Sequence, residues 1–268
     1  MYSEFIINCS AQLSEIVQSE LINIGFEGIW ENNGELYCYI ETKNFNQKIF
    51  EEILEKYKLQ KNYTTKIPEN KNWNEEWEKS YEPVLVNSQC AIRATFHEPF
   101  NVEYEIVITP KMSFGTGHHS TTFLMAQSLF ELNITNKTVL DMGCGTGILA
   151  ILAEKLGASK VTAIDNEDNA VENTIENIKN NNCSKISVLK NESDFNGKFD
   201  LIMSNITKNI NLEMLEKYSF SLNNDGIILL SGFYTEDVED LKIACKKQNL
   251  KIFNQKSKNN WACIYLKK

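Results

Sequence analysis

The chain has 268 residues, of which 42% are hydrophobic and 24% charged, and its formal net charge is −9. This is the composition of an ordinary globular protein, and the acidic balance argues against broad binding of nucleic acid, which requires a basic surface. The apolar runs fall far short of the ~20 residues that cross a bilayer, and the N-terminus lacks the features of a secretory signal, so we expect a cytoplasmic protein without membrane contact.

The first 60 residues predict a small α/β unit in the order strand, helix, strand, strand, helix. Asn32-Asn33-Gly34 favours a hairpin turn between two of these strands. The βαββα order predicts a ferredoxin-like domain over residues 1–60, and its lack of a catalytic constellation indicates a recognition module or an oligomerisation surface. The expected elements are strands over 4–8, 28–31 and 35–40 and helices over 13–24 and 45–57.

Residues 61–110 are interpreted as a linker followed by the first strands of a second domain. Trp73 and Trp77 lie four residues apart in a predicted short helix over 72–81. Their spacing favours aromatic side chains that pin this helix to a domain, with stacking on a substrate as the alternative. Short strands are expected over 84–86, 90–96 and 104–109.

Residues 111–268 alternate between predicted strands and helices, which indicates a doubly wound, mostly parallel sheet. The last two strands are expected to form an antiparallel pair. The predicted helices span 120–132, 148–156, 168–180, 208–218 and 237–248, and the predicted strands span 138–141, 160–164, 186–189, 199–203, 226–231, 251–255 and 261–266.

The segment from Thr138 to Asp165 predicts a nucleotide-binding unit of strand, glycine turn, helix and strand. Its third glycine comes one residue earlier than in the dinucleotide fingerprint, so we predict S-adenosyl-L-methionine, with NAD or a non-binding turn as alternatives. Gly143 and Gly145 let the backbone approach the ligand. Asp165 is expected to accept the ribose hydroxyls, and Asp141 to pair with the cofactor's amino group, directly or through water.

A second cluster, PKMSFGTGHHSTT, predicts a loop that closes over the ligand before a helix begins. Phe114, Thr116 and Thr122 are its candidate cofactor-binding residues. His118 and His119 are adjacent and have no third ligand nearby, so we expect loop packing or a substrate-side role instead of metal binding. The seven scattered cysteines form no C-x-x-C pair, which also argues against a metal site or a disulfide framework.

A third candidate is Asn205, at the tip of the predicted strand LIMSN. This strand tip faces the methyl group in such folds, and an amide oxygen there could orient an incoming amine. We therefore predict a catalytic and cofactor-binding role for Asn205, with an ordinary turn-capping asparagine as the alternative.

Four segments of the chain together resemble the ribosomal protein L11 methyltransferase family. They are FGTGHHSTT, VLDMGCGTGILAI, AIDNEDNAVENTIENIKNN and SNI, in the family's order; the W-x-x-x-W helix and the near-terminal Trp261 are also similar. The resemblance implies a ferredoxin-like domain that grips the substrate, a linker, and a Rossmann-like class I methyltransferase domain over residues 111–268 with a seven-stranded sheet. It implies cofactor contacts at Thr122, Gly143, Asp165 and Asn205.

The family's activity is methylation of the α-amino group and lysine side chains of ribosomal protein L11, free or on the ribosome. We expect a monomer that makes no sequence-specific contact with nucleic acid. The alternatives are another S-adenosylmethionine-dependent N-methyltransferase, acting on a small molecule or a nucleic acid, and a ribosome-associated binding protein with a vestigial cofactor site.

Overall fold

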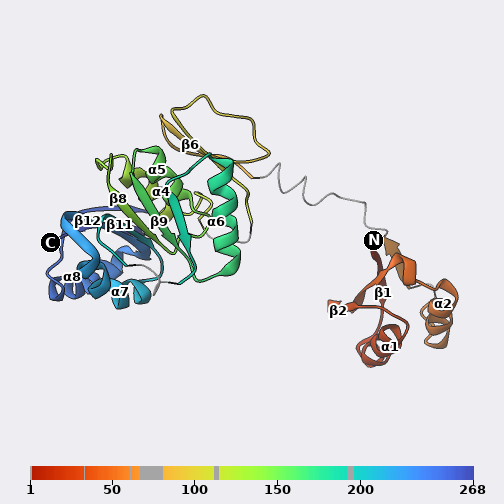
Figure 1. Cartoon of the computed structure of the whole chain (residues 1–268). Coiled ribbons are helices and arrows are strands. Elements are labelled where there is room, and N and C mark those ends of the chain that lie inside the picture. The colour runs from red at the N-terminus through yellow and green to blue at the C-terminus, as the bar shows by residue number, and fades with distance from the viewer. Residues whose placement is uncertain (1, 33, 61, 67–80, 112–114, 192–195) are drawn as a thin grey trace. The chain divides into compact units, whose positions relative to one another are not determined.

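The computed structural model describes residues 2–32, 34–60, 62–66, 81–111, 115–191 and 196–268. The chain divides into two compact units, Met1–Ser80 and Tyr81–Lys268. Figure 1 labels their elements along the chain. The segment 61–110 contributes one strand to the first unit and three strands to the second.

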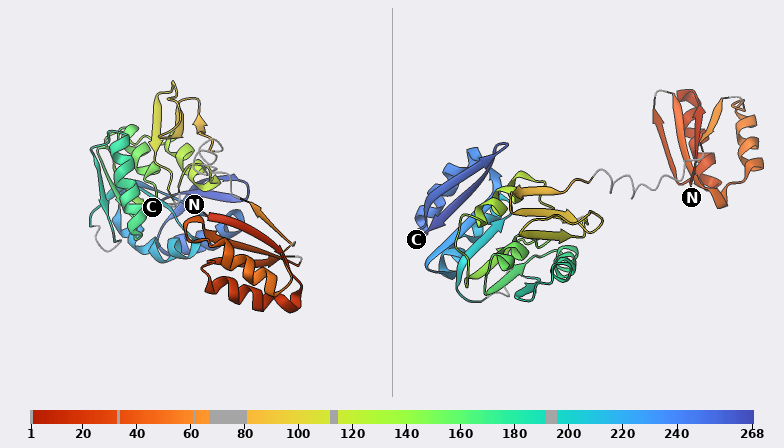
Figure 2. Two further views of the ribbon diagram at one scale, coloured as in Figure 1. Left: turned by 90° about the vertical axis from the view of Figure 1, so that its right-hand side faces the viewer. Right: turned by 90° about the horizontal axis from the view of Figure 1, so that it is seen from above.

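The first unit is a four-stranded antiparallel sheet with two helices against one face (Figure 2). Its strand order, β2-β3-β1-β4, is that of a ferredoxin-like fold, as predicted. The short polar strand β4 was not predicted. The elements are β1 (Tyr2–Asn8), α1 (Ala11–Asn23), β2 (Gly28–Asn32), β3 (Glu35–Glu41), a 3-10 turn (Thr42–Asn44), α2 (Gln47–Lys56) and β4 (Tyr63–Lys66).

The alternation of side chains along β1 and β3 builds the core of this unit. Every second residue is buried against the two helices, whereas the residues between them lie on the opposite, open face. The Asn46 side chain accepts from the Lys48 and Ile49 N–H groups and so caps α2. The buried residues that meet in this core include Phe5, Ile7, Val17, Leu21, Leu36, Cys38, Ile40, Phe50 and Leu54.

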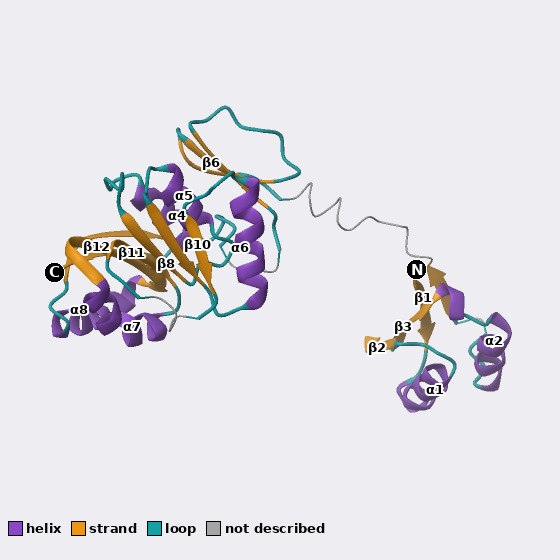
Figure 3. Ribbon diagram, in the orientation of Figure 1, coloured by secondary structure: helices purple, strands orange, loops and turns teal. Residues whose placement is uncertain are grey.

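The second unit contains a seven-stranded sheet in the order β10-β9-β8-β11-β12-β14-β13. All its neighbouring strands pair in parallel except β14, which is antiparallel to both β12 and β13. This confirms the predicted doubly wound sheet, whose strands and helices alternate in Figure 3. The strands are β8 (Thr138–Met142), β9 (Lys160–Ile164), β10 (Ile186–Leu189), β11 (Phe199–Asn205), β12 (Leu222–Tyr234), β13 (Lys251–Lys258) and β14 (Trp261–Lys267).

Helices cover both faces of this sheet. One face packs against α4 and α5, and the other against α7 and α8, so successive residues of each strand enter two separate cores. Val139 of β8, for example, belongs to the first core and Leu140 to the second. The helices are α4 (Ser120–Leu129), α5 (Ile148–Lys155), α6 (Asp168–Asn180), α7 (Lys208–Ser221), a 3-10 turn (Thr235–Asp237) and α8 (Val238–Lys247).

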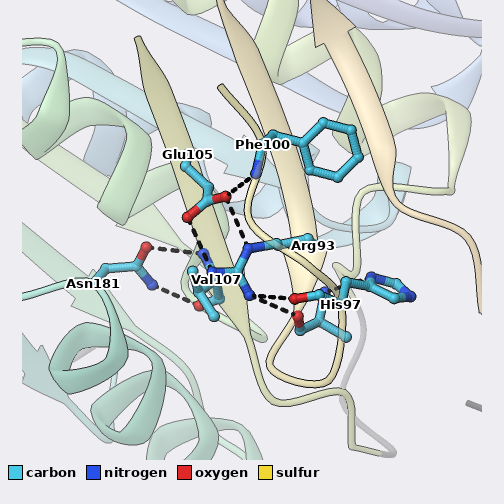
Figure 4. A network of polar contacts seen from close by, with 7 residues as sticks. Arg93, His97, Phe100, Glu105, Val107 and Asn181 are labelled. Atoms are coloured by element: carbon cyan, nitrogen blue, oxygen red, sulfur yellow. Dashed lines mark hydrogen bonds and ion pairs between the residues drawn. The ribbon is translucent and has the colours of Figure 1, made fainter. Parts of the chain in front are cut away.

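A three-stranded sheet of β5 (Val84–Asn87), β6 (Cys90–Ala94) and β7 (Tyr104–Ile108) joins the core beside α4 and α5. An ion pair between Arg93 and Glu105, 2.8 Å long, links β6 to the parallel strand β7 (Figure 4). The Arg93 guanidinium holds the pKa of the Glu105 carboxyl below its ordinary value. Glu105 also accepts from the Phe100 N–H and so fixes the β6–β7 connection.

The predicted helix over 72–81, with Trp73 and Trp77, lies outside the described residues except for Tyr81, which is not helical. In the described part of the chain, no helix has both the length and the apolarity needed to cross a membrane.

Candidate active site

A cavity of about 610 Å³ opens at the carboxyl ends of the parallel strands. Its volume is within the range found for small-molecule binding sites. It lies where the strand order reverses between β8 and β11, the usual ligand position in doubly wound sheets. Its lining comes from the carboxyl ends of β8, β9 and β11 with the segments that follow them, from the start of α4, and from β12 and β14. The lining residues are His119, Thr121, Gly143, Gly145, Asp165, Asn166, Glu167, Asn169, Ala170, Asn205, Ile206, Thr207, Ile210, Gly232 and Trp261.

The glycine turn after β8 forms part of the cavity wall. Its backbone conformation and its close neighbours leave no room for side chains. Gly143, Gly145 and Gly147 have φ of +70°, +56° and +79°, a left-handed conformation that favours glycine. A Cβ atom on Gly143 would lie 2.2 Å from the Ile206 side chain. Gly143 and Gly145 therefore present bare backbone to the cavity, and their role in binding a ligand stays a prediction.

Asp165 follows β9 and lies beside the turn. One of its carboxylate oxygens accepts from the Gly145 N–H at 2.8 Å and the other from the Glu167 N–H at 3.1 Å. A carboxylate has about four acceptor positions, so each oxygen retains one for a ligand hydroxyl. Asp165 thus combines support of the turn with free acceptor capacity at the cavity.

Asn205 lies at the end of β11, where its side chain is 9% exposed. Its amide nitrogen donates to the Thr122 hydroxyl at 3.2 Å, which fixes the orientation of the amide. The Asn205 Oδ1 atom is buried and has no hydrogen-bond partner among the described residues. An unsatisfied buried acceptor costs about 1–3 kcal/mol, so this oxygen is suited to a ligand N–H or O–H donor.

Thr122 and Asp141 are buried and do not line the main cavity. Thr122 lines a small neighbouring void together with Gly143 and Asn205. Asp141 is 1% exposed, and its carboxylate accepts from the Ala150 N–H at 3.1 Å. Burial, together with the negative charge of Asp165, raises the pKa of Asp141 to about 7. Direct pairing of Asp141 with a cofactor amino group stays a prediction.

The two histidines of the loop before α4, His118 and His119, contact different partners. The His118 ring lies 2.7 Å from the Glu82 carbonyl oxygen and 3.2 Å from the Thr116 hydroxyl, which is a loop-packing arrangement. His119 lines the cavity, and its Nδ1 accepts from the Thr121 N–H at the start of α4. Phe114 lies outside the described residues. Within the described ranges, no group of three or more His, Cys, Asp or Glu side chains could hold a metal ion.

The sequence named Trp261 only for its similarity to the family, and it assigned no site role to Trp261 or to any residue of β12. Trp261 lines the cavity, and its ring centroid lies 4.7 Å from that of His119 and 4.2 Å from that of Tyr234. Gly232 also lines it, with φ of +94° at a register shift between β12 and β14. A glycine inside a strand pattern is a signal for such a bulge, whereas no sequence pattern brings Trp261 to the cavity.

A larger groove of about 1220 Å³ runs between α7, α8 and β13. Lys198, Lys217, Lys246 and the 75% exposed Phe220 are among its lining residues. None of the predicted site residues contributes to it, and its lining contains neither the carboxyl end of a parallel strand nor a glycine turn. The cavity at the carboxyl ends of the strands is therefore the candidate active site.

The sequence and the fold can be compared with known proteins. The family model described as ribosomal protein L11 methyltransferase (PrmA) matches residues 2–268. The ribosomal protein L11 methyltransferase of Porphyromonas gingivalis is 41% identical over 259 residues, 93% of this chain and 89% of the relative. That of Phocaeicola vulgatus is 38% identical over 264 residues, 96% of this chain and 94% of the relative. The similarity therefore extends over both units.

Among solved structures, the ribosomal protein L11 methylase of Lactobacillus delbrueckii subsp. bulgaricus is similar to this chain with a TM-score of 0.66 and 30% identity. The match covers 70% of this chain and 99% of that chain.

Proposed function

Because the chain belongs to the ribosomal protein L11 methyltransferase family, we propose that it methylates the α-amino group and lysine side chains of ribosomal protein L11. It is an enzyme whose methyl donor is S-adenosyl-L-methionine. One observation carries the proposal for this chain: Asn205, whose buried Oδ1 has no hydrogen-bond partner among the described residues, lines the same cavity as the glycine turn and Asp165.

The residues at the cavity fit this cofactor. Asp165 has acceptor capacity for two ribose hydroxyls, and the bare backbone at Gly143 and Gly145 permits close approach of the ligand. Thr122 fixes the amide of Asn205 from behind. We propose that these five residues hold the cofactor, with Asp141, Phe114 and Thr116 as further contacts.

S-Adenosyl-L-methionine supplies, when bound, a methyl group on a sulfonium that departs as a neutral thioether and needs no general acid. The protein must then align an amine that has lost its proton. Alignment of two reactants can contribute roughly 7–11 kcal/mol to the lowering of the barrier. We propose that Asn205 Oδ1 accepts a hydrogen bond from the amine N–H and so directs its lone pair.

The apolar part of the cavity wall favours the neutral amine. Ile206, Ile210 and Trp261 contribute to it. An apolar environment disfavours the charged form of an amine and lowers its pKa, from about 10.4 for lysine and about 7.7–8.0 for an α-amine. The α-amino group is therefore the easier target, and no general base is assigned.

We propose that the first unit recognises the protein substrate with its open sheet face, the side of β1, β2 and β3 that points away from the helices. Trp30 stacks on Tyr37 there, with ring centroids 4.2 Å apart. Tyr37 and Tyr39 donate to the carboxylates of Glu35 and Glu4. An exposed tryptophan beside half-buried tyrosines and carboxylates suits a partner rich in lysine and arginine.

We further propose that the enzyme acts as a monomer in the cytoplasm, on L11 either free or on the ribosome. A ribosomal substrate implies this compartment. All seven cysteines are free thiols, which agrees with a reducing environment.

The proposal is tested by incubating the enzyme with labelled S-adenosyl-L-methionine and a mixture of ribosomal proteins and ribosomal RNA, followed by separation of the components. We expect the label in the L11 band with the wild-type enzyme and its loss with Asn205→Ala. Label in RNA, in another protein or in a small molecule would favour the alternative methyltransferases, and its absence from every component would favour a binding protein.

A further inference from the structure

Helix α6 buries a row of asparagines instead of a row of apolar residues. Asn173, Asn177 and Asn181 follow one another at intervals of four, so they lie on one face of the helix and its C-cap. Their side chains are 0%, 0% and 7% exposed. Buried amides are costly unless they are hydrogen-bonded, and in the described part of the chain every amide atom of this row except Asn173 Oδ1 has a partner.

The partner is the backbone of β7 and the residue that follows it. The Asn181 side chain accepts from the Val107 N–H at 2.9 Å and donates to the Val107 carbonyl at 2.6 Å (Figure 4). Asn177 accepts from the Thr109 N–H at 2.8 Å, and Asn173 donates to the Thr109 carbonyl at 3.0 Å. The amides thus pair with one edge of β7 as a neighbouring strand would.

Asn177 differs from Asn181 in the group to which its side-chain amide nitrogen donates. Its amide nitrogen donates to the Thr146 carbonyl in the glycine turn at 2.9 Å. The Thr146 hydroxyl donates in turn to the Gly115 carbonyl at 2.7 Å, in the loop before α4. The second donor bond of Asn181 goes to the Asn177 carbonyl of its own helix.

We propose that Asn177 is a positioning residue for the cofactor. The Asn177 amide oxygen binds the N–H of Thr109, at the start of the loop before α4, and its amide nitrogen binds the carbonyl of Thr146, in the glycine turn. The side chain therefore holds these two segments at a fixed separation. The cofactor-binding turn is therefore set by a side chain that does not line the cavity. An amide is needed because Thr109 N–H requires an acceptor and the Thr146 carbonyl requires a donor. Leucine has a similar shape but offers neither.

The test compares Asn177→Leu with Asn181→Leu in the full-length enzyme, because the two residues lie one turn apart and are similarly buried. The measurements are the Kd of S-adenosylhomocysteine by calorimetry, the Tm, and the KM for S-adenosyl-L-methionine and for the protein substrate. We expect Asn177→Leu to weaken S-adenosylhomocysteine binding at least ~10-fold and to raise the cofactor KM alone. Asn181→Leu should leave the Kd within about twofold. It should lower the Tm at least as much, because it removes three buried hydrogen bonds where Asn177→Leu removes two.

Equal changes in Kd for the two variants, or an unchanged Kd for Asn177→Leu, would overturn the proposal and assign the row a role in stability alone. If Asn177→Leu does not fold, Asn177→Ala and Asn181→Ala carry the same comparison, because the smaller side chain leaves room for water at the orphaned groups. The binding readout is independent of the methyl acceptor, so an error in the assignment of L11 would appear separately, as normal cofactor binding without L11 methylation.

Discussion

Asn205 lines the cavity; its amide nitrogen donates to the Thr122 hydroxyl, and its Oδ1 atom is buried without a hydrogen-bond partner among the described residues. Replacement by alanine removes the acceptor proposed to direct the amine. We predict that Asn205→Ala lowers kcat by about 100-fold, the size of effect that follows loss of one well-placed polar group. Steady-state kinetics give kcat. Calorimetry with S-adenosylhomocysteine is expected to show that cofactor binding persists and is weakened far less than turnover, because Asp165 and the glycine turn remain. Unchanged turnover would remove Asn205 from the mechanism.

Asp141 makes stability depend on pH, because its pKa is raised to about 7 by burial and by the charge of Asp165. The native state retains a proton that an unfolded aspartate, with a pKa near 3.9, has lost. The resulting stabilisation is complete below about pH 4 and is lost as the pH rises toward 7.

We therefore predict that Asp141→Asn gains stability relative to the wild type as the pH rises, by up to about 1.4 kcal/mol per pH unit between about pH 5 and 7. Urea unfolding at a series of pH values measures the difference in unfolding free energy between the two proteins. The contributions of the other titrating groups are the same in both proteins and cancel in this difference. Parallel stability curves for the two proteins would show that Asp141 is already charged in the native state.

At the scale of elements, β12 shapes the site through the backbone of Gly232. A Cβ atom there would lie 2.0 Å from the Ile206 carbonyl oxygen, in the segment that connects Asn205 to α7. We predict that Gly232→Ala displaces this segment, lowers stability by about 1–3 kcal/mol and weakens S-adenosylhomocysteine binding. Chemical denaturation and calorimetry measure the two effects.

Gly197→Ala is the matched control for this prediction. Gly197 also has a positive φ, +136°, but a Cβ atom there would meet nothing within 4 Å. The Gly197→Ala variant should therefore be less stable, through backbone strain, and should bind S-adenosylhomocysteine as the wild type does. If both variants bind S-adenosylhomocysteine as the wild type does, the contact between Gly232 and Ile206 does not shape the site.

The elements of the second unit could largely be predicted from the sequence because their apolar patterns are regular. The predicted strands at 160–164 and 186–189 and the helix at 168–180 match the structure residue for residue. The strand β4 was missed because Tyr63-Thr64-Thr65-Lys66 has no apolar alternation, and its place is determined by pairing with β1.

The candidate site was predicted in part, for a similar reason. Gly143, Gly145, Asp165 and Asn205 follow strands whose carboxyl ends must meet, so strand order alone brings them together. Trp261 reaches the cavity through the antiparallel insertion of β14 beside β12. That position depends on the order of the whole sheet, which no local pattern contains.

At the scale of the whole molecule, the first unit is proposed to supply affinity for the protein substrate and the second to supply the reaction. Trp30 is 48% exposed and belongs to the open sheet face. We predict that Trp30→Ala raises the KM for L11 by about 10-fold, as loss of an interface tryptophan worth ~1.4 kcal/mol would do, with kcat unchanged. Steady-state kinetics with intact L11 and with a short lysine peptide measure this effect; the peptide KM should not change.

Phe253→Ala provides the control, because Phe253 is a comparably exposed aromatic residue, 44%, on β13 of the second unit. Its replacement should leave the KM for L11 unchanged. Equal effects of the two substitutions would argue against recognition through the open sheet face.

The proposed acceptor is tested most directly by mass spectrometry of purified L11 after incubation with the enzyme and S-adenosyl-L-methionine. Our account predicts methyl groups on the N-terminal α-amine and on lysine side chains of L11, and their loss when the enzyme carries Asn205→Ala. Unmodified L11 in the presence of an enzyme that binds S-adenosylhomocysteine normally would contradict it.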